Sequence, residues 1–214
     1  MQLFSYSFIR VDIIIWGESM NTAVAKNKRA LSTLDIVYVG MFAALMMIGA
    51  NITSFVPFLV IGGVPITLQT FFAVLAGVLL GSRTGAISMA LYAVIGLAGA
   101  PVFAQFQGGI GQILRPTFGF ILSFILTAYA AGKIVENNKQ LSRFIIAAII
   151  GTAINYIVGT NWMYSAYKFW FEAPPGFTYG TAWLWMALPM PKDLILAVIA
   201  GILAHRMQKV VKRS

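Results

Sequence analysis

Apolar runs close to twenty residues long, enough to cross the hydrocarbon core of a bilayer, recur along the whole chain. They constrain the fold more than any other feature of the sequence. Hydrophobic residues make up 59% of the chain and charged residues 10%, whereas charged residues approach about a quarter of soluble domains. A membrane β-barrel would instead alternate apolar and polar residues in segments of about ten. The sequence therefore predicts an all-α integral membrane protein folded as a helical bundle.

Glycine, proline and polar residues divide the apolar sequence into six segments, because these residues end helices or turn the chain. We predict one transmembrane helix for each segment and a single membrane domain over residues 34–206. A cytoplasmic N-terminal segment, 1–33, precedes this domain, and a basic cytoplasmic tail, 207–214, follows it. The six predicted helices cover residues 34–56, 66–80, 84–97, 113 or 117 to 134, 143–164 and 191–204.

Lysine and arginine are divided unevenly between the two ends of these helices, and such residues favour the cytoplasmic side of a membrane. Eleven lie at one set of ends and three at the other, with Arg10 unassigned. The asymmetry predicts that both termini are cytoplasmic in a multi-pass protein of the plasma membrane of a bacterial-type cell. The eleven residues are Lys26, Lys28, Arg29, Arg83, Lys133, Lys139, Arg143, Arg206, Lys209, Lys212 and Arg213, and the three are Arg115, Lys168 and Lys192.

The first nineteen residues contain an apolar stretch that Arg10 and Asp12 interrupt, so it is too short and too charged to span a membrane. It also lacks the small-residue cleavage site of a signal peptide. One interpretation is an interfacial helix. The other, which we favour, is that Met20 is the native start, because Trp16, Gly17 and Glu18 require purine-rich codons that resemble a ribosome-binding site.

A glycine-rich stretch at residues 99–119, GAPVFAQFQGGIGQILRPTFG, whose single charged residue is Arg115, is the least membrane-like part of the predicted domain. Irregular backbone cannot face lipid, because each unsatisfied backbone group in hydrocarbon costs several kcal/mol. The charge distribution places this stretch on the outer side. We therefore predict that it forms one wall of a solute pocket there.

Arg115 and Asp193 are charged residues away from the cytoplasmic ends, which makes them candidates for function. Arg115 is suited to binding a carboxylate through two hydrogen bonds, or it extends to the interface as arginines near helix ends do. Asp193 is suited to accepting hydrogen bonds from ligand N–H groups, with Lys192 as a nearby cation. Its alternative role is to cap the last helix.

Several uncharged side chains are further candidates for the pocket, each with a purely structural alternative. Asparagines such as Asn155 often link helices within membranes. Trp162 belongs to a group of tryptophans typical of an interfacial belt. The uncharged candidates are Tyr92, Gln105, Gln107, Asn155 and Trp162, with Thr67, Gln69 and Tyr156 as further groups that complete a pocket.

The residue inventory argues against several classes of function. The chain has no cysteine, and its single histidine, His205, lies next to the basic tail, so we expect no metal site and no cofactor. Phosphate-binding loops and hydrolase motifs are missing, which argues against an enzyme. The basic residues suit topology rather than nucleic acid. No chain of acidic residues crosses the predicted helices, so we expect energy for transport to come from another subunit.

Small residues line part of the first predicted helix. Gly40 and Ala44 are four positions apart, and Ala43 widens the same surface. Such a pattern permits another helix to approach closely, either inside the bundle or from a partner subunit.

Residues 64–120 carry a series of short motifs in a fixed order: VPITLQT, LLG with a basic residue two positions on, GLAGAPVFA, GG and PTFG. This series closely resembles the biotin-specific S components of energy-coupling factor (ECF) transporters, the BioY family. The resemblance continues more loosely through INYIVGTNWMY and PMPKDLILAVIAGILAHR, so it covers roughly residues 34–206.

The resemblance implies a six-helix, substrate-binding membrane subunit that captures biotin from outside and works with a scaffold subunit and two ATPases. ATP would then be used only by those partners. It assigns Gly40, Ala43 and Ala44 to the scaffold contact. Asp193 matches an acidic residue of the family, but Leu196 stands where the family has a lysine, which leaves Lys192 or Arg115 to supply the cation. A self-sufficient facilitator or secondary transporter for a small vitamin-like solute remains the alternative.

Overall fold

A computed structural model describes residues 31–52, 54, 60–61 and 64–208 of the chain. The chain divides into two units, Met1–Ser32 and Thr33–Ser214, and the helices of the described part all lie in the second. The choice between Met1 and Met20 as the start falls outside the described residues, as does the proline expected to end the first helix, Pro57.

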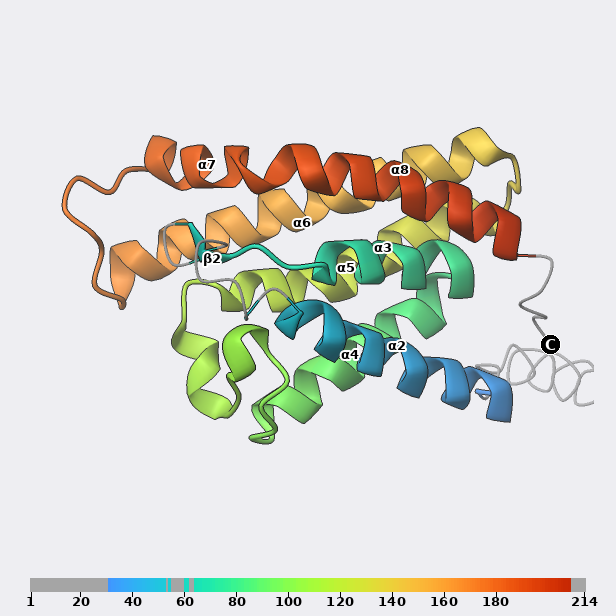
Figure 1. Ribbon diagram of the computed structural model, residues 1–214, viewed down its shortest axis with the longest axis horizontal. Coiled ribbons are helices and arrows are strands. Elements are labelled where there is room, and N and C mark those ends of the chain that lie inside the picture. Colours follow the sequence, from blue (N-terminus) through green and yellow to red (C-terminus); the bar gives the residue numbers. More distant parts are fainter. Residues whose placement is uncertain (1–30, 53, 55–59, 62–63, 209–214) are drawn as a thin grey trace, which may run out of the picture. The chain divides into compact units, whose positions relative to one another are not determined.

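The described residues of the second unit are mainly helical and include one small hairpin (Figure 1). Strands β1 (Val60–Ile61) and β2 (Val64–Pro65) pair antiparallel, with Val60 opposite Pro65. The α-helices of the described part are α2 (Thr33–Asn51), α3 (Gln69–Leu80), α4 (Ser82–Leu97), α5 (Phe118–Glu136), α6 (Leu141–Phe169), α7 (Tyr179–Ala187) and α8 (Pro189–Met207). Two short 3-10 turns, η1 (Ala104–Phe106) and η2 (Ile110–Leu114), lie between α4 and α5 in the chain.

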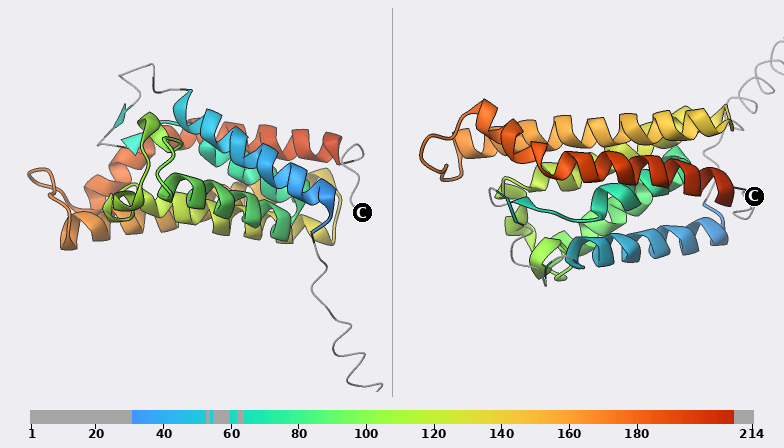
Figure 2. Two further views of the ribbon diagram at one scale, coloured as in Figure 1. Left: turned by 90° about the horizontal axis from the view of Figure 1, so that it is seen from below. Right: turned by 45° about the horizontal axis from the view of Figure 1, so that its top comes forward.

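Helices α3 and α5 form the middle of the unit, between α2 and α4 on one side and α6 and α8 on the other (Figures 1 and 2). Ten of the twelve residues of α3 are buried, and the helix is apolar on all sides, as expected for a helix surrounded by others. Gly77 of α3 permits a close approach to α5, because a Cβ at this position would overlap the backbone of Ala128.

The tight connection between α3 and α4 depends on Gly81, which has a φ of 89° that other residues rarely adopt. The start of α4 is stabilised from α5, because Glu136 accepts hydrogen bonds from the backbone N–H and the hydroxyl of Ser82. Lys133 forms an ion pair with the same carboxylate at 3.0 Å. These contacts hold the start of α4 against the end of α5.

Each of the six predicted apolar segments contains a helix, but the lengths differ from the prediction. Helix α6 continues to Phe169, five residues beyond its predicted end, and α7 is a separate helix between the fifth and sixth predicted segments. Among the described residues, α2, α5 and α6 are long and apolar enough to cross a membrane. Helices α7 and α8, which meet at 53°, pass the same test together, whereas α3 and α4 are shorter.

Candidate functional site

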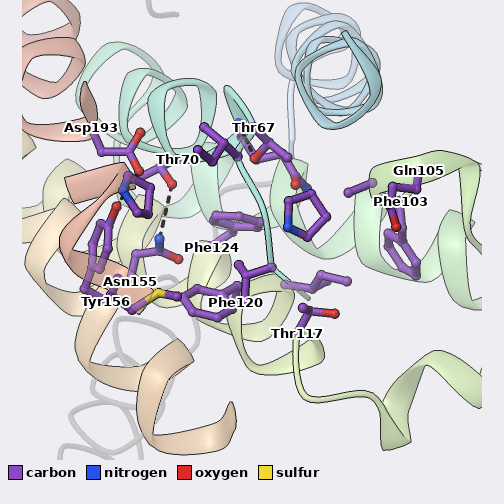
Figure 3. Close-up of a pocket in the computed structure, with 18 of the residues that line it drawn as sticks. Thr67, Thr70, Phe103, Gln105, Thr117, Phe120, Phe124, Asn155, Tyr156 and Asp193 are labelled. Carbon is purple, nitrogen blue, oxygen red and sulfur yellow. Dashed lines mark hydrogen bonds between the residues drawn. The ribbon is translucent and has the colours of Figure 1, made fainter. Parts of the chain in front are cut away.

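A cavity lies at the end of the unit where β2, η1, η2 and the start of α5 meet (Figure 3). It exists because α3 is short: twelve residues extend about 18 Å, whereas the nineteen of α5 extend about 28 Å. The space beyond the first residue of α3, Gln69, is therefore left open. The empty space within the cavity, including the part open to solvent, is about 860 Å³.

Two sides of this cavity differ in construction, and we name them by their residues. The helix wall comes from α3, α6 and α8, and the loop wall comes from the connection between α4 and α5. Figure 3 shows Phe120 and Phe124 of α5 between the two walls. The helix wall consists of Thr70, Asn155, Tyr156, Lys192 and Asp193, and the loop wall of Phe103, Gln105, Gln107, Gln112 and Arg115.

Asp193 is the buried charge of the helix wall, with 6% of the residue exposed. Its Oδ2 accepts a hydrogen bond of 2.7 Å from the hydroxyl of Tyr156, and its Oδ1 lies 2.8 Å from Lys192 Nζ. Oδ1 accepts no hydrogen bond of good geometry, so the ion pair with Lys192 is its only partner among the described residues. Because a carboxylate has about four acceptor positions, Asp193 retains capacity for N–H donors of a ligand.

The proposed capping role of Asp193 is not what the structure shows. Helix α8 begins at Pro189, two residues before the predicted start, and its first turn contains no acidic residue. Proline is favoured at the first helical position because its missing N–H is not needed there. Asp193 therefore lies in the second turn, where its carboxylate contacts side chains instead of the free N–H groups of the helix.

Lys192 is partly buried beside Asp193, and its Nζ also donates to the backbone oxygen of Thr67 at 2.5 Å. The lysine thus connects α8 to the segment that leads into α3. Both of its observed partners are acceptors, so its charge is already used to neutralise Asp193 and to hold this segment in place.

Asn155 lines the cavity and also links three helices. Its Nδ2 donates to Thr70 Oγ1 of α3 at 3.2 Å, and its Oδ1 lies 2.5 Å from the hydroxyl of Ser123 on α5. Asn155 is 3% exposed. The carboxamide therefore contributes to helix packing, and Thr70 and Ser123 complete a network that the sequence alone did not indicate.

The loop wall is more exposed than the helix wall and is held mainly by its own hydrogen bonds. The backbone of Phe103 donates to the carbonyl of Gln107 at 2.9 Å, which closes a small loop around Gln105. Gln112 Nε2 approaches Gln107 Oε1 at 3.5 Å. Arg115 is exposed at the cavity, and its guanidinium forms no ion pair with any described residue. A cation of this kind is available to an anionic group of a ligand.

Tyr92 does not line the cavity, although the sequence suggested it as a ligand residue. It is fully buried on α4, where its hydroxyl donates to the carbonyl of Val102 at 3.2 Å and accepts from Gln69 Nε2 at 2.8 Å. Tyr92 therefore fixes the orientation of the Gln69 carboxamide. The Gln69 Oε1 atom, which no described residue contacts by hydrogen bond, remains available in the cavity.

Trp162 also lies outside the cavity, behind the residues that form the loop wall. Its ring packs against Phe118 and Trp170, and its Nε1 donates to the carbonyl of Arg115 at 3.4 Å. Trp170 Nε1 donates to the carbonyl of Leu114 at 2.7 Å. The two tryptophans thus attach the loop before α5 to the far end of α6.

Six of the eight predicted ligand residues line one cavity although they come from four separate parts of the chain. Thr70, Thr117, Phe120 and Phe124 also line it and were not predicted. Thr70 follows Thr67 by three positions in the VPITLQT motif, and this helical spacing could have indicated that the two residues lie on the same side. The six predicted lining residues are Gln105, Gln107, Arg115, Asn155, Lys192 and Asp193.

The small residues of α2 divide between its two faces. Gly40 and Ala44 are exposed, and a Cβ at Gly40 would meet no atom within 4 Å, whereas Ala43 is 1% exposed and packs in the core. The outward surface of α2 at Gly40 and Ala44 is therefore flat and open.

Comparison with known proteins identifies the relatives of the chain. Its sequence matches the BioY family over residues 20–213. The chain belongs to this family. The BioYB protein of Bacillus subtilis (strain 168) is 49% identical over 189 residues, which covers 87% of this chain and 94% of the relative. The biotin transporter BioY of Thermotoga maritima is 31% identical, covering 82% and 96%.

The BioY chain also shares its fold with a solved structure. A crystal structure at 2.1 Å of the S-component for biotin from an ECF-type ABC transporter superimposes with a TM-score of 0.67. The match covers 82% of this chain and 90% of that one, at 22% sequence identity. At this level of identity the likeness establishes the bundle, and the individual cavity residues are argued from their own chemistry.

Proposed function

We propose that the chain is the biotin-binding subunit of an ECF-type transporter, as its membership of the BioY family and the name of the Thermotoga maritima relative support. The observation that carries the proposal is the cavity, where a buried, ion-paired carboxylate stands on one wall and an exposed arginine on the other. A site with one acceptor group and one free cation suits a small ligand that carries both N–H donors and a carboxylate.

In this proposal, the ureido N–H groups of biotin donate to Asp193 and to the Gln69 oxygen. The fused rings pack on the apolar surface between the walls, which Phe120 and Phe124 provide. The valerate carboxylate meets Arg115, because Lys192 is already engaged by Asp193 and the Thr67 carbonyl. The ligand thereby connects the helix wall to the loop wall.

We further propose that the membrane domain, residues 34–206, crosses the bilayer six times with both termini in the cytoplasm of the cell. The charge asymmetry supports this orientation, since it assigns the cavity to the outer side, where a nutrient arrives. Helices α3 and α4 are shorter than a full span, and the enclosure of α3 within the bundle removes its need to match the full thickness of the lipid.

Energy for uptake comes, on this proposal, from a scaffold membrane subunit and two ATPase subunits. The exposed small residues Gly40 and Ala44 on α2 suit close packing with a helix of the scaffold. Ala43, which is buried, would support that surface from within by keeping α2 close to the core.

The test is biotin binding to the purified full chain in detergent or lipid nanodiscs, measured by titration calorimetry. We expect saturable binding with one biotin per chain at submicromolar concentration, and dethiobiotin as a competitor tests the fit of the rings. Lack of saturable binding in folded protein would overturn the proposal. Uptake by vesicles containing this chain alone, compared with vesicles that also hold scaffold and ATPases, separates an ECF subunit from a self-sufficient facilitator.

A further inference from the structure

Gln105 of the loop wall and its neighbour Phe106 have left-handed backbone conformations, with φ of 60° and 56°. They are the only residues other than glycine with positive φ in the described part of the chain. Side chains make this region unfavourable, because the Cβ approaches the following carbonyl oxygen. Such a pair persists only where the surrounding structure holds it, and here it directs Gln105 to the cavity.

The groups that hold this pair come from the end of α2. Ser54 Oγ accepts from the backbone N–H of Gln105 at 3.1 Å, and Asn51 Oδ1 accepts from that of Phe106 at 2.8 Å. Asn51 Nδ2 donates to the carbonyl of Val102 at 3.2 Å. One carboxamide thus binds both ends of the segment from Val102 to Phe106, on an element that is distant in sequence.

Asn161, in the interior of α6, serves as a comparison. Its Nδ2 donates to the carbonyl four residues earlier, Ile157, at 2.7 Å, and its Oδ1 accepts from the hydroxyl of Tyr179 at 3.3 Å. Asn51 makes the corresponding bond to Met47 at 3.1 Å and uses its remaining donor and its acceptor for the loop wall. It is 8% exposed, so water does not readily replace these bonds.

The carbonyl of Val102 joins this anchor to the other side of the cavity. It accepts from both Asn51 Nδ2 and the Tyr92 hydroxyl, and Tyr92 in turn accepts from Gln69. The hydrogen bonds that anchor the loop to α2 and those that orient Gln69 therefore meet at one atom, the carbonyl oxygen of Val102.

We propose that Asn51 is a positioning residue, which holds Gln105 and Phe106 left-handed and so presets the loop wall for the ligand. This inference rests on the biotin-binding function proposed above, but Asn51 itself does not line the cavity. Its role needs one acceptor and two donors on one side chain, which a carboxamide provides and a carboxylate or hydroxyl does not.

The first test compares Asn51→Ala with the control Asn161→Ala, which also removes a carboxamide and its bond within a helix, together with a bond from Tyr179 that lies outside the cavity. We expect Asn51→Ala to weaken biotin binding on the order of tenfold, mainly through faster dissociation, while the control stays within about twofold. Hydrogen exchange at the amides of Gln105 and Phe106 should accelerate in Asn51→Ala alone. Unchanged exchange at both amides would overturn the inference, whether or not the wild type binds biotin.

The second test is rescue by glycine. In the Asn51→Ala background, Phe106→Gly should recover part of the lost affinity, because glycine adopts positive φ without the steric penalty. Phe106→Ala is the matched control, since it also removes the ring but keeps the Cβ, and it should not restore binding. Equal effects of the two substitutions would show that the left-handed backbone is not what Asn51 maintains. Wild-type protein that fails to bind biotin would overturn the proposed function, and the exchange measurement would still decide the role of Asn51.

Discussion

The two walls of the cavity achieve order in different ways. The helix wall is buried, and its polar side chains connect α3, α5, α6 and α8 to one another. The loop wall is more exposed and depends on backbone conformation, with anchors on α2 and on the tryptophans of α6. A bound ligand would therefore meet one surface that is fixed by packing and another that is fixed by a few hydrogen bonds.

The largest effect is expected from Asp193→Asn in the helix wall. The substitution keeps the shape but removes the charge that accepts ligand N–H groups and neutralises Lys192, so biotin affinity should fall on the order of a hundredfold. Titration calorimetry on the folded variant measures it. Asp35→Asn, on the first turn of α2 and outside the cavity, is the control. Wild-type affinity combined with a lower Tm would assign Asp193 to stability alone.

Arg115→Ala tests the loop wall and should weaken biotin binding by about tenfold, because a charge-assisted pair with the ligand carboxylate is lost. Biotinamide, which lacks that carboxylate, should bind the variant and the wild type equally. High salt should reduce the difference for biotin, since Arg115 is exposed. An equal loss for both ligands would mean that Arg115 acts through the loop and not through the carboxylate.

Tyr156→Phe removes the donor to Asp193 Oδ2 and should cost about fivefold in affinity, because the carboxylate loses a partner that fixes its direction. Tyr129→Phe, which alters an exposed tyrosine of α5, is the matched control. The comparison between the walls predicts that Tyr156→Phe acts equally on biotin and biotinamide. A selective effect on biotin would place the ligand carboxylate at the helix wall instead.

The smallest effect is expected from Trp170→Phe, which keeps an aromatic ring but removes the hydrogen bond to Leu114. One lost hydrogen bond of about 1 kcal/mol corresponds to a Tm lower by about 2–4 °C in a chain of this size, with binding changed less than about twofold. Trp183→Phe serves as control, because no hydrogen bond of its indole is observed among the described residues. A loss of biotin affinity greater than about twofold would show that the loop wall needs this attachment to bind the ligand.

The helical bundle could be predicted from the sequence because apolar length and helix-breaking residues are local signals. The start of α8 at Pro189 was not predicted, because Pro191 also suits a first helical position. Helix α7 was missed because its nine residues lie among aromatic residues that also suit an interfacial loop.

The six predicted ligand residues that line the cavity are chemically unusual for a membrane. Charged and amide side chains such as Asp193, Arg115 and Gln105 indicate a functional site in a membrane protein, because they are costly in lipid. Tyr92 and Trp162 carry the same polar tips, but whether such a tip meets a ligand or a backbone carbonyl depends on tertiary packing. The role of Asn51 was invisible for the same reason, since its partners lie about fifty residues away.

The shortness of α3 has a consequence for how ligand size is set. The cavity is the part of the bundle's length that this central helix does not fill, so its depth follows from the residue at which α3 begins. One additional turn before Gln69 would extend the helix by about 5 Å into that space, without altering any surrounding helix. A bundle of this kind can therefore admit ligands of a different size by moving a helix start, while the surrounding helices and the outer surface stay the same.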